Sequence, residues 1–229
     1  MVKNNTIGYL SNATSAYNKH HKNNKGVTVM KNKKAFQIAS TGLMAALSYV
    51  VFTFLQIKIT LPGGDATSIH LGNAVCVLGA LILGGVYGGL GGAIGMTIGD
   101  LFDPVYVIYA PKTLILKFCI GMITGIVAHK VAHITYSNDK KYILRWTVIS
   151  GAAGLVFNAV FDPLFGYFYK LLILGKPAAE LVLAYNVASS AFNAVISLIA
   201  ATIVYMALLP TLKKSGLFIT IGKNKNREG

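Results

Sequence analysis

The chain has 229 residues, of which 54% are hydrophobic and only 12% are charged. A soluble domain carries about a quarter charged residues, so this composition excludes an ordinary soluble protein and indicates an integral membrane protein. The formal net charge of +14 would favour nucleic acid as a partner in a soluble protein. Here the basic residues flank the ends of apolar stretches, and we expect no nucleic-acid partner.

The first 34 residues are rich in Asn, Lys and Ser and contain no apolar core. They are not a secretory signal peptide, and we expect residues 1–34 to form a disordered basic leader. Met30 precedes four polar residues and the first apolar stretch, so a translation start at Met30 is a further hypothesis.

Six apolar stretches follow the leader, and we expect each to be a transmembrane helix. They cover about residues 35–56, 71–83, 86–101, 111–132, 146–174 and 181–209. A turn-forming cluster at Pro62-Gly63-Gly64-Asp65 follows the first, Gly84-Gly85 joins the second to the third, and Pro210 is expected to end the sixth. The second and third stretches are short, which indicates tilt, burial among neighbouring helices or an interrupted helix.

The predicted fold is therefore an all-α membrane protein. Six transmembrane helices form one compact bundle over residues 35–210, followed by a basic cytoplasmic tail over residues 211–229. The leader, the segment around residues 129–145 and the tail after Pro210 are all basic. Lys and Arg mark the cytoplasmic side, so we expect a plasma-membrane protein with both termini in the cytoplasm.

The polar side chains of the apolar stretches recur at one depth, the outward half of the membrane. They are Asp100, Asp103, Lys112, Lys117, Asn158, Asp162, Asn186 and Asn193. Charges inside a bilayer cost roughly 2.5–3.5 kcal/mol each on insertion scales and therefore face a partner or a cavity. This pattern predicts a polar chamber that receives a small molecule from outside.

Within this set the sequence leaves alternatives open. Asp162 needs a cationic partner, and Lys117 and Lys112 are both available, either in a structural ion pair or in a pocket that meets the ligand. Asn186 and Asn193 either join helices by hydrogen bonds or contact the ligand, since amides both donate and accept. The expected substrate-binding residues are His70, Asn73, Asp100, Lys117, Asn158, Asp162, Tyr185, Asn186 and Asn193.

The sequence gives little support to a catalytic or nucleotide-binding function. No Walker-type Gly-Lys-Ser/Thr, paired His-Glu metal motif or Gly-x-Ser-x-Gly elbow occurs, so we expect no enzyme, no metal and no cofactor. Glycines recur every four residues in two series, Gly84/Gly88/Gly92 and Gly91/Gly95/Gly99. They favour close helix packing over nucleotide binding. Cys76 and Cys119 are expected to be small apolar packing residues.

Four segments carry a resemblance to a known family. They are residues 69–73 (Ile-His-Leu-Gly-Asn), 83–88 (Leu-Gly-Gly-Val-Tyr-Gly), 95–101 (Gly-Met-Thr-Ile-Gly-Asp-Leu) and 109–117 (Tyr-Ala-Pro-Lys-Thr-Leu-Ile-Leu-Lys). Together they resemble the substrate-binding S component of an energy-coupling factor (ECF) vitamin transporter, nearest to the riboflavin and hydroxymethylpyrimidine branch, over roughly residues 34–217. The resemblance implies a six-helix protein that binds a vitamin or its precursor in an outward-facing pocket capped by loops. It also implies a transmembrane coupling subunit and two ATPase subunits as partners.

The same resemblance implies a contact face for the coupling subunit. Family members use small residues four apart on the first helix, and Gly42 and Ala46 match here. Ala39 lies nearby and is included in the expected contact face, with packing inside the bundle as the alternative. Ligand contacts do not carry over residue by residue, so the expected ligand is a small heteroaromatic compound such as a pyrimidine, a pyridoxine-like compound or a flavin. A self-contained secondary permease and a membrane-embedded enzyme or assembly factor are the competing functions.

Overall fold

The computed structural model describes residues 33–61, 66–173, 175 and 180–214. The chain divides into two compact units, Met1–Ile38 and Ala39–Gly229, and only the start of the first helix is described in the first unit. The predicted leader up to residue 32, the turn at residues 62–65 and the tail from residue 215 lie outside the described residues.

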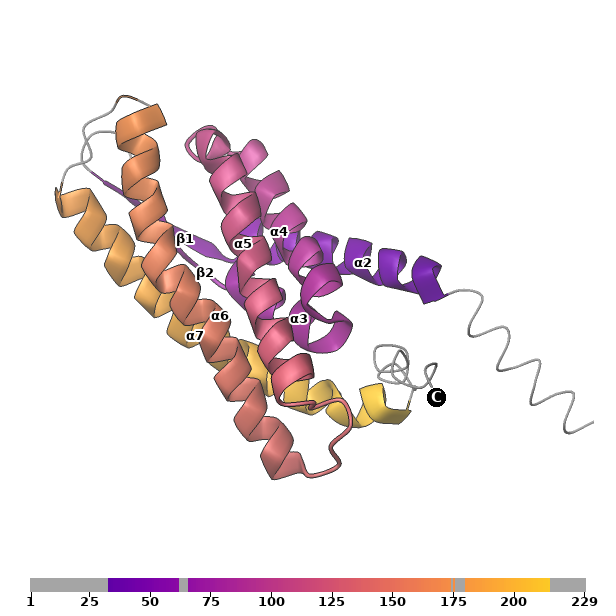
Figure 1. Cartoon of the computed structure of the whole chain (residues 1–229). Helices are drawn as coiled ribbons and strands as arrows, with labels where there is room; N and C mark the ends of the chain where they lie inside the picture. Colours follow the sequence, from indigo (N-terminus) through magenta and orange to yellow (C-terminus); the bar gives the residue numbers. More distant parts are fainter. Residues whose placement is uncertain (1–32, 62–65, 174, 176–179, 215–229) are drawn as a thin grey trace, which may run out of the picture. The chain divides into compact units, whose positions relative to one another are not determined.

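The described residues form six α-helices, as predicted, and a two-stranded sheet (Figure 1). In chain order they are α2 (Lys33–Phe54), β1 (Gln56–Thr60), β2 (Ala66–His70), α3 (Gly72–Leu83), α4 (Gly85–Leu101), α5 (Ala110–Gly125), α6 (Lys140–Phe168) and α7 (Glu180–Lys214). A 3₁₀ turn η1 (Val107–Tyr109) precedes α5, and short π-helical segments η2 (Ile126–Val131) and η3 (Tyr169–Ile173) extend α5 and α6. Within this part of the chain, four helical stretches are long and apolar enough to cross a membrane, 34–54, 107–131, 140–173 and 182–214.

The hairpin of β1 and β2 corrects the prediction of an all-α fold. The strands are antiparallel, with Gln56 opposite His70 and Thr60 opposite Ala66. The segment was expected to be a loop around Pro62-Gly63-Gly64-Asp65. Its flanks hold β-branched residues such as Ile57, Ile59 and Thr67, which favour paired strands.

Helix α3 is short because it is surrounded by protein. All of its residues from Gly72 to Leu83 are buried, and it contacts α4, α5 and α7. A helix with no lipid-facing side does not need the length of a membrane-spanning helix. Of the three explanations that the sequence left open for α3, burial among neighbouring helices is the one observed.

Glycines bring the inner helices into backbone contact. A methyl group placed on Gly88 of α4 would overlap the backbone of Gly79 in α3, and one on Gly121 of α5 would overlap the backbone of Gly89. Such contacts replace the hydrophobic driving force that is missing between helices in lipid. We call these three helices, together with residues 39–54 of α2, the glycine-packed scaffold.

Helix α2 joins the scaffold through one of its faces. Ser48 donates a 2.9 Å hydrogen bond to the carbonyl of Gly92, and a methyl group on Gly95 would overlap the backbone of Ala45. Thr41 meets Gly91 in the same way. The predicted close packing is therefore observed for the glycines of both series except Gly84, around which a methyl group would meet nothing within 4 Å.

Two helix boundaries differ from the prediction. Helix α6 begins at Lys140 rather than near Trp146, because Asp139 caps its first turn by accepting a 2.8 Å hydrogen bond from the backbone N–H of Lys141. Helix α7 continues through Pro210 to Lys214, so residues 211–214 are helical rather than part of a tail. The ammonium group of Lys213 holds that last turn by donating to the carbonyl of Ser137 at 2.7 Å.

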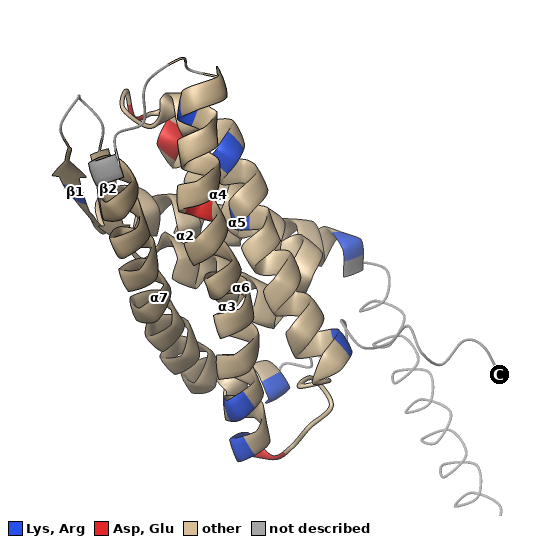
Figure 2. Ribbon diagram, turned by 60° about the vertical axis from the view of Figure 1, so that its left-hand side comes forward, with Lys and Arg blue, Asp and Glu red and all other residues tan. Residues whose placement is uncertain are grey.

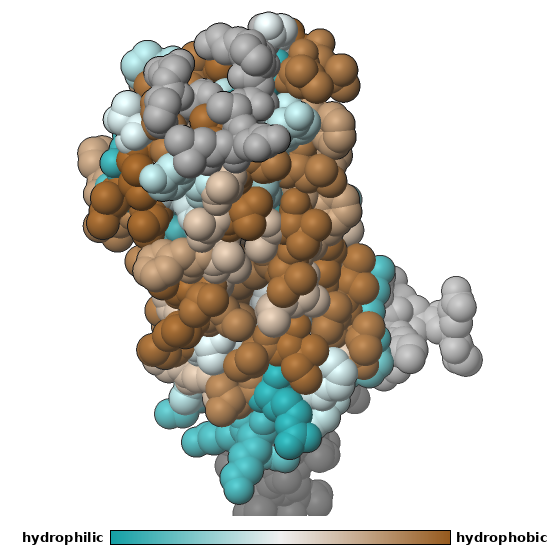
Figure 3. Space-filling model, turned by 90° about the vertical axis from the view of Figure 1, so that its left-hand side faces the viewer, coloured by the Kyte–Doolittle hydropathy of each residue, from teal (hydrophilic) through white to brown (hydrophobic). Residues whose placement is uncertain are grey.

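Charged and apolar residues occupy different parts of the bundle surface. The helix bodies are largely free of charged residues, which gather toward the helix ends (Figure 2). On the face shown in Figure 3, apolar side chains form a broad band, and hydrophilic side chains gather at one end. Large apolar side chains such as those of Leu43, Ile199 and Ile203 are exposed, which is typical of a surface that faces lipid.

Candidate functional site

A cavity opens at the end of the bundle where the hairpin lies. Its empty volume is about 720 Å³, which includes space open to the surface. The ends of α4, α5, α6 and α7 meet there with β2. Its polar lining residues are Thr67, Ser68, His70, Asp100, Tyr106, Tyr109, Lys112, Thr113, Lys117, Asp162, Lys170, Asn186, Ser189, Ser190 and Asn193.

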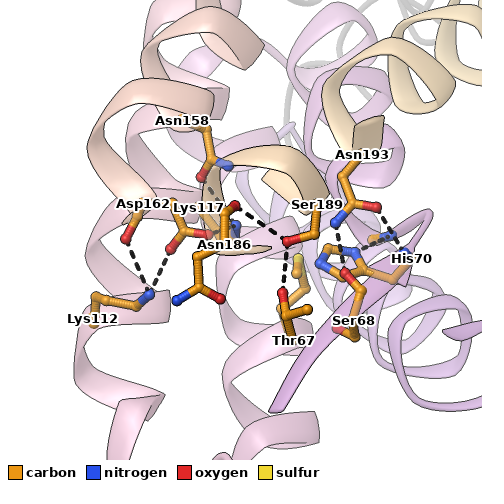
Figure 4. Close-up of polar contacts among 12 residues, drawn as sticks. Thr67, Ser68, His70, Lys112, Lys117, Asn158, Asp162, Asn186, Ser189 and Asn193 are labelled. Atoms are coloured by element: carbon orange, nitrogen blue, oxygen red, sulfur yellow. Dashed lines mark hydrogen bonds and ion pairs between the residues drawn. The ribbon is translucent and has the colours of Figure 1, made fainter. Parts of the chain in front are cut away.

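Two lysines of α5 share one aspartate of α6 on one wall of the cavity (Figure 4). Lys112 lies 2.7 Å from Asp162 and Lys117 lies 3.9 Å from it, so both partners considered from the sequence contact this carboxylate. Lys117 also donates a 3.0 Å hydrogen bond to the side-chain oxygen of Asn158, one helical turn before Asp162. The charges of Lys112, Lys117 and Asp162 are thus paired, as the cost of isolated charge in an apolar interior requires.

On the opposite side, α7 is joined to the hairpin by side-chain hydrogen bonds. The amide of Asn193 accepts from the backbone N–H of His70 at 2.9 Å and donates to the carbonyl of Ser68 at 2.8 Å (Figure 4). Thr67 and Ser189 share a hydroxyl–hydroxyl bond of 2.6 Å. Asn193 therefore satisfies the edge of β2 much as a neighbouring strand would.

His70 lies at the end of β2 with its ring turned edge-on to Phe52, at a ring separation of 4.9 Å. Its Nδ1 accepts a 3.2 Å hydrogen bond from the backbone N–H of Gly72, which places the proton on Nε2. Burial, reinforced by the charge of Lys117, lowers the pKa of His70 to about 3. The imidazole is therefore neutral at physiological pH.

Two polar lining groups have hydrogen-bonding capacity left over. Asp100, in the last turn of α4, is 3% exposed and forms no ion pair with any described residue. The hydroxyl of Thr113 is its hydrogen-bonding partner. The side-chain amide of Asn186 faces the cavity and makes no hydrogen bond to the described part of the chain.

The structure brings most of the expected substrate-binding residues to this cavity. Those that line it are His70, Asp100, Lys117, Asp162, Asn186 and Asn193. The other three lie elsewhere: Asn158 stands behind the wall and holds Lys117, Asn73 is buried in the first turn of α3, and Tyr185 is 45% exposed on α7.

Several lining residues were not among those expected. Thr67 and Ser68 were missed because the hairpin was taken for a loop, although period-two alternation beside a turn-forming cluster could have revealed it. Lys170 was assigned to a span without a role, and it lies beside the ring of Tyr109, with its ammonium 5.8 Å from the ring centroid. Tyr109, which was not among the expected residues, is 8% exposed and lines the cavity.

The three small residues assigned to a coupling subunit share the free face of α2. Ala39, Gly42 and Ala46 are exposed, and a methyl group on Gly42 would meet nothing within 4 Å. Thr41 and Ala45, one position away on the helix, pack on α4 instead. The face carrying Gly42 is therefore not used for packing within the described bundle.

Comparison with known proteins connects this architecture to a family. The model of the family described as ECF-type riboflavin transporter, S component, matches residues 32–209, which is most of the chain. Among solved structures, ThiT from Listeria monocytogenes is similar, with a TM-score of 0.59 and 17% sequence identity over 82% of this chain and 99% of that one. At that identity the likeness shows a common fold. The chain belongs to the S components of ECF-type riboflavin transporters, the substrate-binding membrane subunits of ECF vitamin importers.

Proposed function

We propose that this S component captures a small heteroaromatic vitamin or vitamin precursor, of the riboflavin or hydroxymethylpyrimidine type, from outside the cell. The observation that carries the proposal is the polar cavity at the hairpin end of an otherwise apolar bundle. Its aromatic wall residues Tyr106 and Tyr109 offer flat apolar surface, and its amide and hydroxyl groups offer donors and acceptors to a ring. Both kinds of contact suit a planar heterocycle.

The proposed orientation places the cavity outside and both termini in the cytoplasm. Basic residues support it, since Lys130, Lys140, Lys141 and Arg145 lie at or near the end of the bundle opposite the cavity. Positive residues accumulate on the cytoplasmic side of membrane proteins. The cavity then opens toward the medium that supplies the solute.

We further propose that delivery requires a transmembrane coupling subunit and two ATPase subunits. The chain itself contains no Walker motif. The free face of α2 with Ala39, Gly42 and Ala46 supports a docking role, because small residues allow two helix backbones to approach closely in lipid.

Two measurements test this function. Purified protein is extracted and any co-purified small molecule is identified by mass spectrometry, and uptake of that molecule is measured in cells with and without the ATPase subunits. We expect a heteroaromatic compound, and uptake that disappears without the ATPases. Uptake that persists would instead establish a self-contained permease, and chemical conversion of the compound by the purified protein would establish an enzyme.

A further inference from the structure

The two carboxylates of the cavity are held in different ways. Asp162 is neutralised by Lys112 and Lys117. Asp100 faces the same space from α4 and forms no ion pair with any residue the structure describes, although it is 3% exposed. Lys112 and Lys117 act on Asp100 only at longer range, and a buried carboxylate with no cation in direct contact is costly and therefore rare.

Its position on the helix makes this cost larger. Asp100 is the last residue but one of α4, where the exposed backbone carbonyls give the helix end a partial negative charge. A carboxylate is stabilised at the opposite end of a helix. The hydroxyl of Thr113 supplies a single donor, whereas a carboxylate has room for about four.

Three lining residues that carry N–H donors are already engaged in other contacts. Lys112 and Lys117 are committed to Asp162 and Asn158, and the amide of Asn193 is committed to β2. A solute that enters the cavity can supply such donors to Asp100.

We propose that Asp100 is the specificity-determining residue of the cavity and that it accepts a hydrogen bond from a nitrogen donor on the ring of the solute. The donor is a ring N–H, an exocyclic amino group or a protonated ring nitrogen. The hydrogen bond to ionised Asp100 is charge-assisted and forms only when the solute is bound. A ring whose corresponding nitrogen carries no hydrogen is rejected, because Asp100 would then stay buried and unpaired. This inference rests on the proposed capture of a heteroaromatic solute.

The test compares solutes with and without hydrogens on the ring or exocyclic nitrogen, which methyl groups replace in the second member of each pair. Protein in lipid nanodiscs is titrated with riboflavin and 3-methylriboflavin, and with 4-amino-5-hydroxymethyl-2-methylpyrimidine and its 4-dimethylamino counterpart. For the parent compound that binds, we expect methylation to weaken binding by about 10- to 100-fold, the range typical of a hydrogen bond to a charged group. The titration is repeated with Asp100→Asn and Thr113→Val.

In Asp100→Asn the preference for the unmethylated compound should shrink to within a few-fold. Thr113→Val should not reduce the preference, because this change leaves the carboxylate in place and removes only the donor that the protein supplies to it. Asp103→Asn is the matched control: Asp103 is the next carboxylate along the chain, lies outside the cavity lining and pairs with Lys58. It should behave as the wild type does.

The outcomes separate the inference from the function on which it rests. Equal affinity of wild-type protein for a parent compound and its methylated form overturns the role of Asp100 and leaves the proposed function standing. An undiminished preference in folded Asp100→Asn does the same. Binding of neither parent compound overturns both. The wild-type comparison needs no variant, so it remains decisive if Asp100→Asn fails to fold.

Discussion

The glycine-packed scaffold and the cavity are built on the same helices and differ in what those helices leave between them. Along most of α4, glycines such as Gly88 and Gly89 remove side chains so that α3 and α5 meet it backbone to backbone. At the hairpin end the same α4 carries Asp100, and α5 carries Lys112 and Lys117. Where side chains are absent the helices close together, and where long polar side chains stand they hold space open.

This difference teaches how a small membrane protein can keep a polar chamber. Backbone contacts in the scaffold are fixed by geometry and have no adjustable side chain, so they hold the helix axes in place. The cavity walls are held by ion pairs and hydrogen bonds, which can be exchanged for contacts with a solute. Changes in the scaffold should therefore have the largest effect on the protein, changes in the cavity smaller effects, and changes on the free face of α2 the smallest.

The largest effect is expected from filling a glycine contact. In Gly88→Val the new side chain would overlap the backbone of Gly79, and neither backbone can move without separating α3 from α4. We expect loss of folded protein, measured as yield and as a monodisperse peak in size-exclusion chromatography in detergent. Gly42→Ala is the control, since its methyl group meets nothing within 4 Å. A well-folded Gly88→Val variant would contradict the role given to the scaffold.

A smaller but still large effect is expected from Asp162→Ala. This change leaves Lys112 and Lys117 without their shared carboxylate. Breaking a buried ion pair costs about 3–5 kcal/mol, and because the Asp162 side chain is 25% exposed, the lower end is expected. The measurement is the thermal midpoint of purified protein, with solute binding measured in parallel.

The double change Lys112→Met with Asp162→Leu sharpens that result. It removes one lysine together with the carboxylate, so it should be more stable than Asp162→Ala alone if unpaired charge is the cause. An equal loss of stability in both variants would indicate that packing, rather than charge, explains the effect.

An intermediate effect is expected from Asn193→Ala. The variant loses the hydrogen bonds to the N–H of His70 and the carbonyl of Ser68, each worth about 1 kcal/mol. Because these bonds tie β2 to α7, we expect faster amide hydrogen exchange in residues 66–70 and faster solute release. Unchanged exchange in this strand would show that the hairpin is held by other contacts.

The smallest effect on the protein itself is expected on the free face of α2. Leucine at both Gly42 and Ala46 should leave folding and solute binding unchanged, because neither residue packs within the bundle. Uptake in cells should nevertheless be lost if this face meets the coupling subunit. Leu43 is an exposed residue next to Gly42 in the sequence. Leu43→Ala therefore serves as the control, and this variant should transport normally. Retained uptake in the double leucine variant would remove α2 from the proposed interface.

Much of the helical order was predictable because it follows from hydropathy. Apolar runs gave the helices to within a few residues in α3 and α4, and α5 begins at Ala110, one residue before the predicted start. Errors arose where local signals compete with tertiary contacts. Pro210 did not end α7, because a helix held in place by neighbours and by Lys213 tolerates one missing N–H donor. The hairpin was missed because its residues were assigned by their turn formers and not by their alternation.

Most of the residues expected from the sequence line the cavity, but the sequence did not predict which of them bind one another and which face the cavity unpaired. Polar side chains in apolar helices had to converge somewhere, since isolation in lipid is costly, and His70, Asp100, Lys117, Asp162, Asn186 and Asn193 do line one cavity. Spacing alone could not distinguish Asn193, whose amide is taken up by β2, from Asn186, whose amide faces the cavity. Both lie on the same stripe of α7.

The sequence by itself determined that the chain is a helical membrane protein, where most of its helices run and which polar residues needed a common chamber. Those conclusions depend on transfer of side chains between water and lipid, which composition and order largely control. Only the tertiary structure decided which polar groups satisfy one another and which remain open to a solute. Hydrogen-bond partners are set by distances between helices, and those distances depend on backbone contacts such as Gly79 with Gly88 that join residues from different segments of the chain.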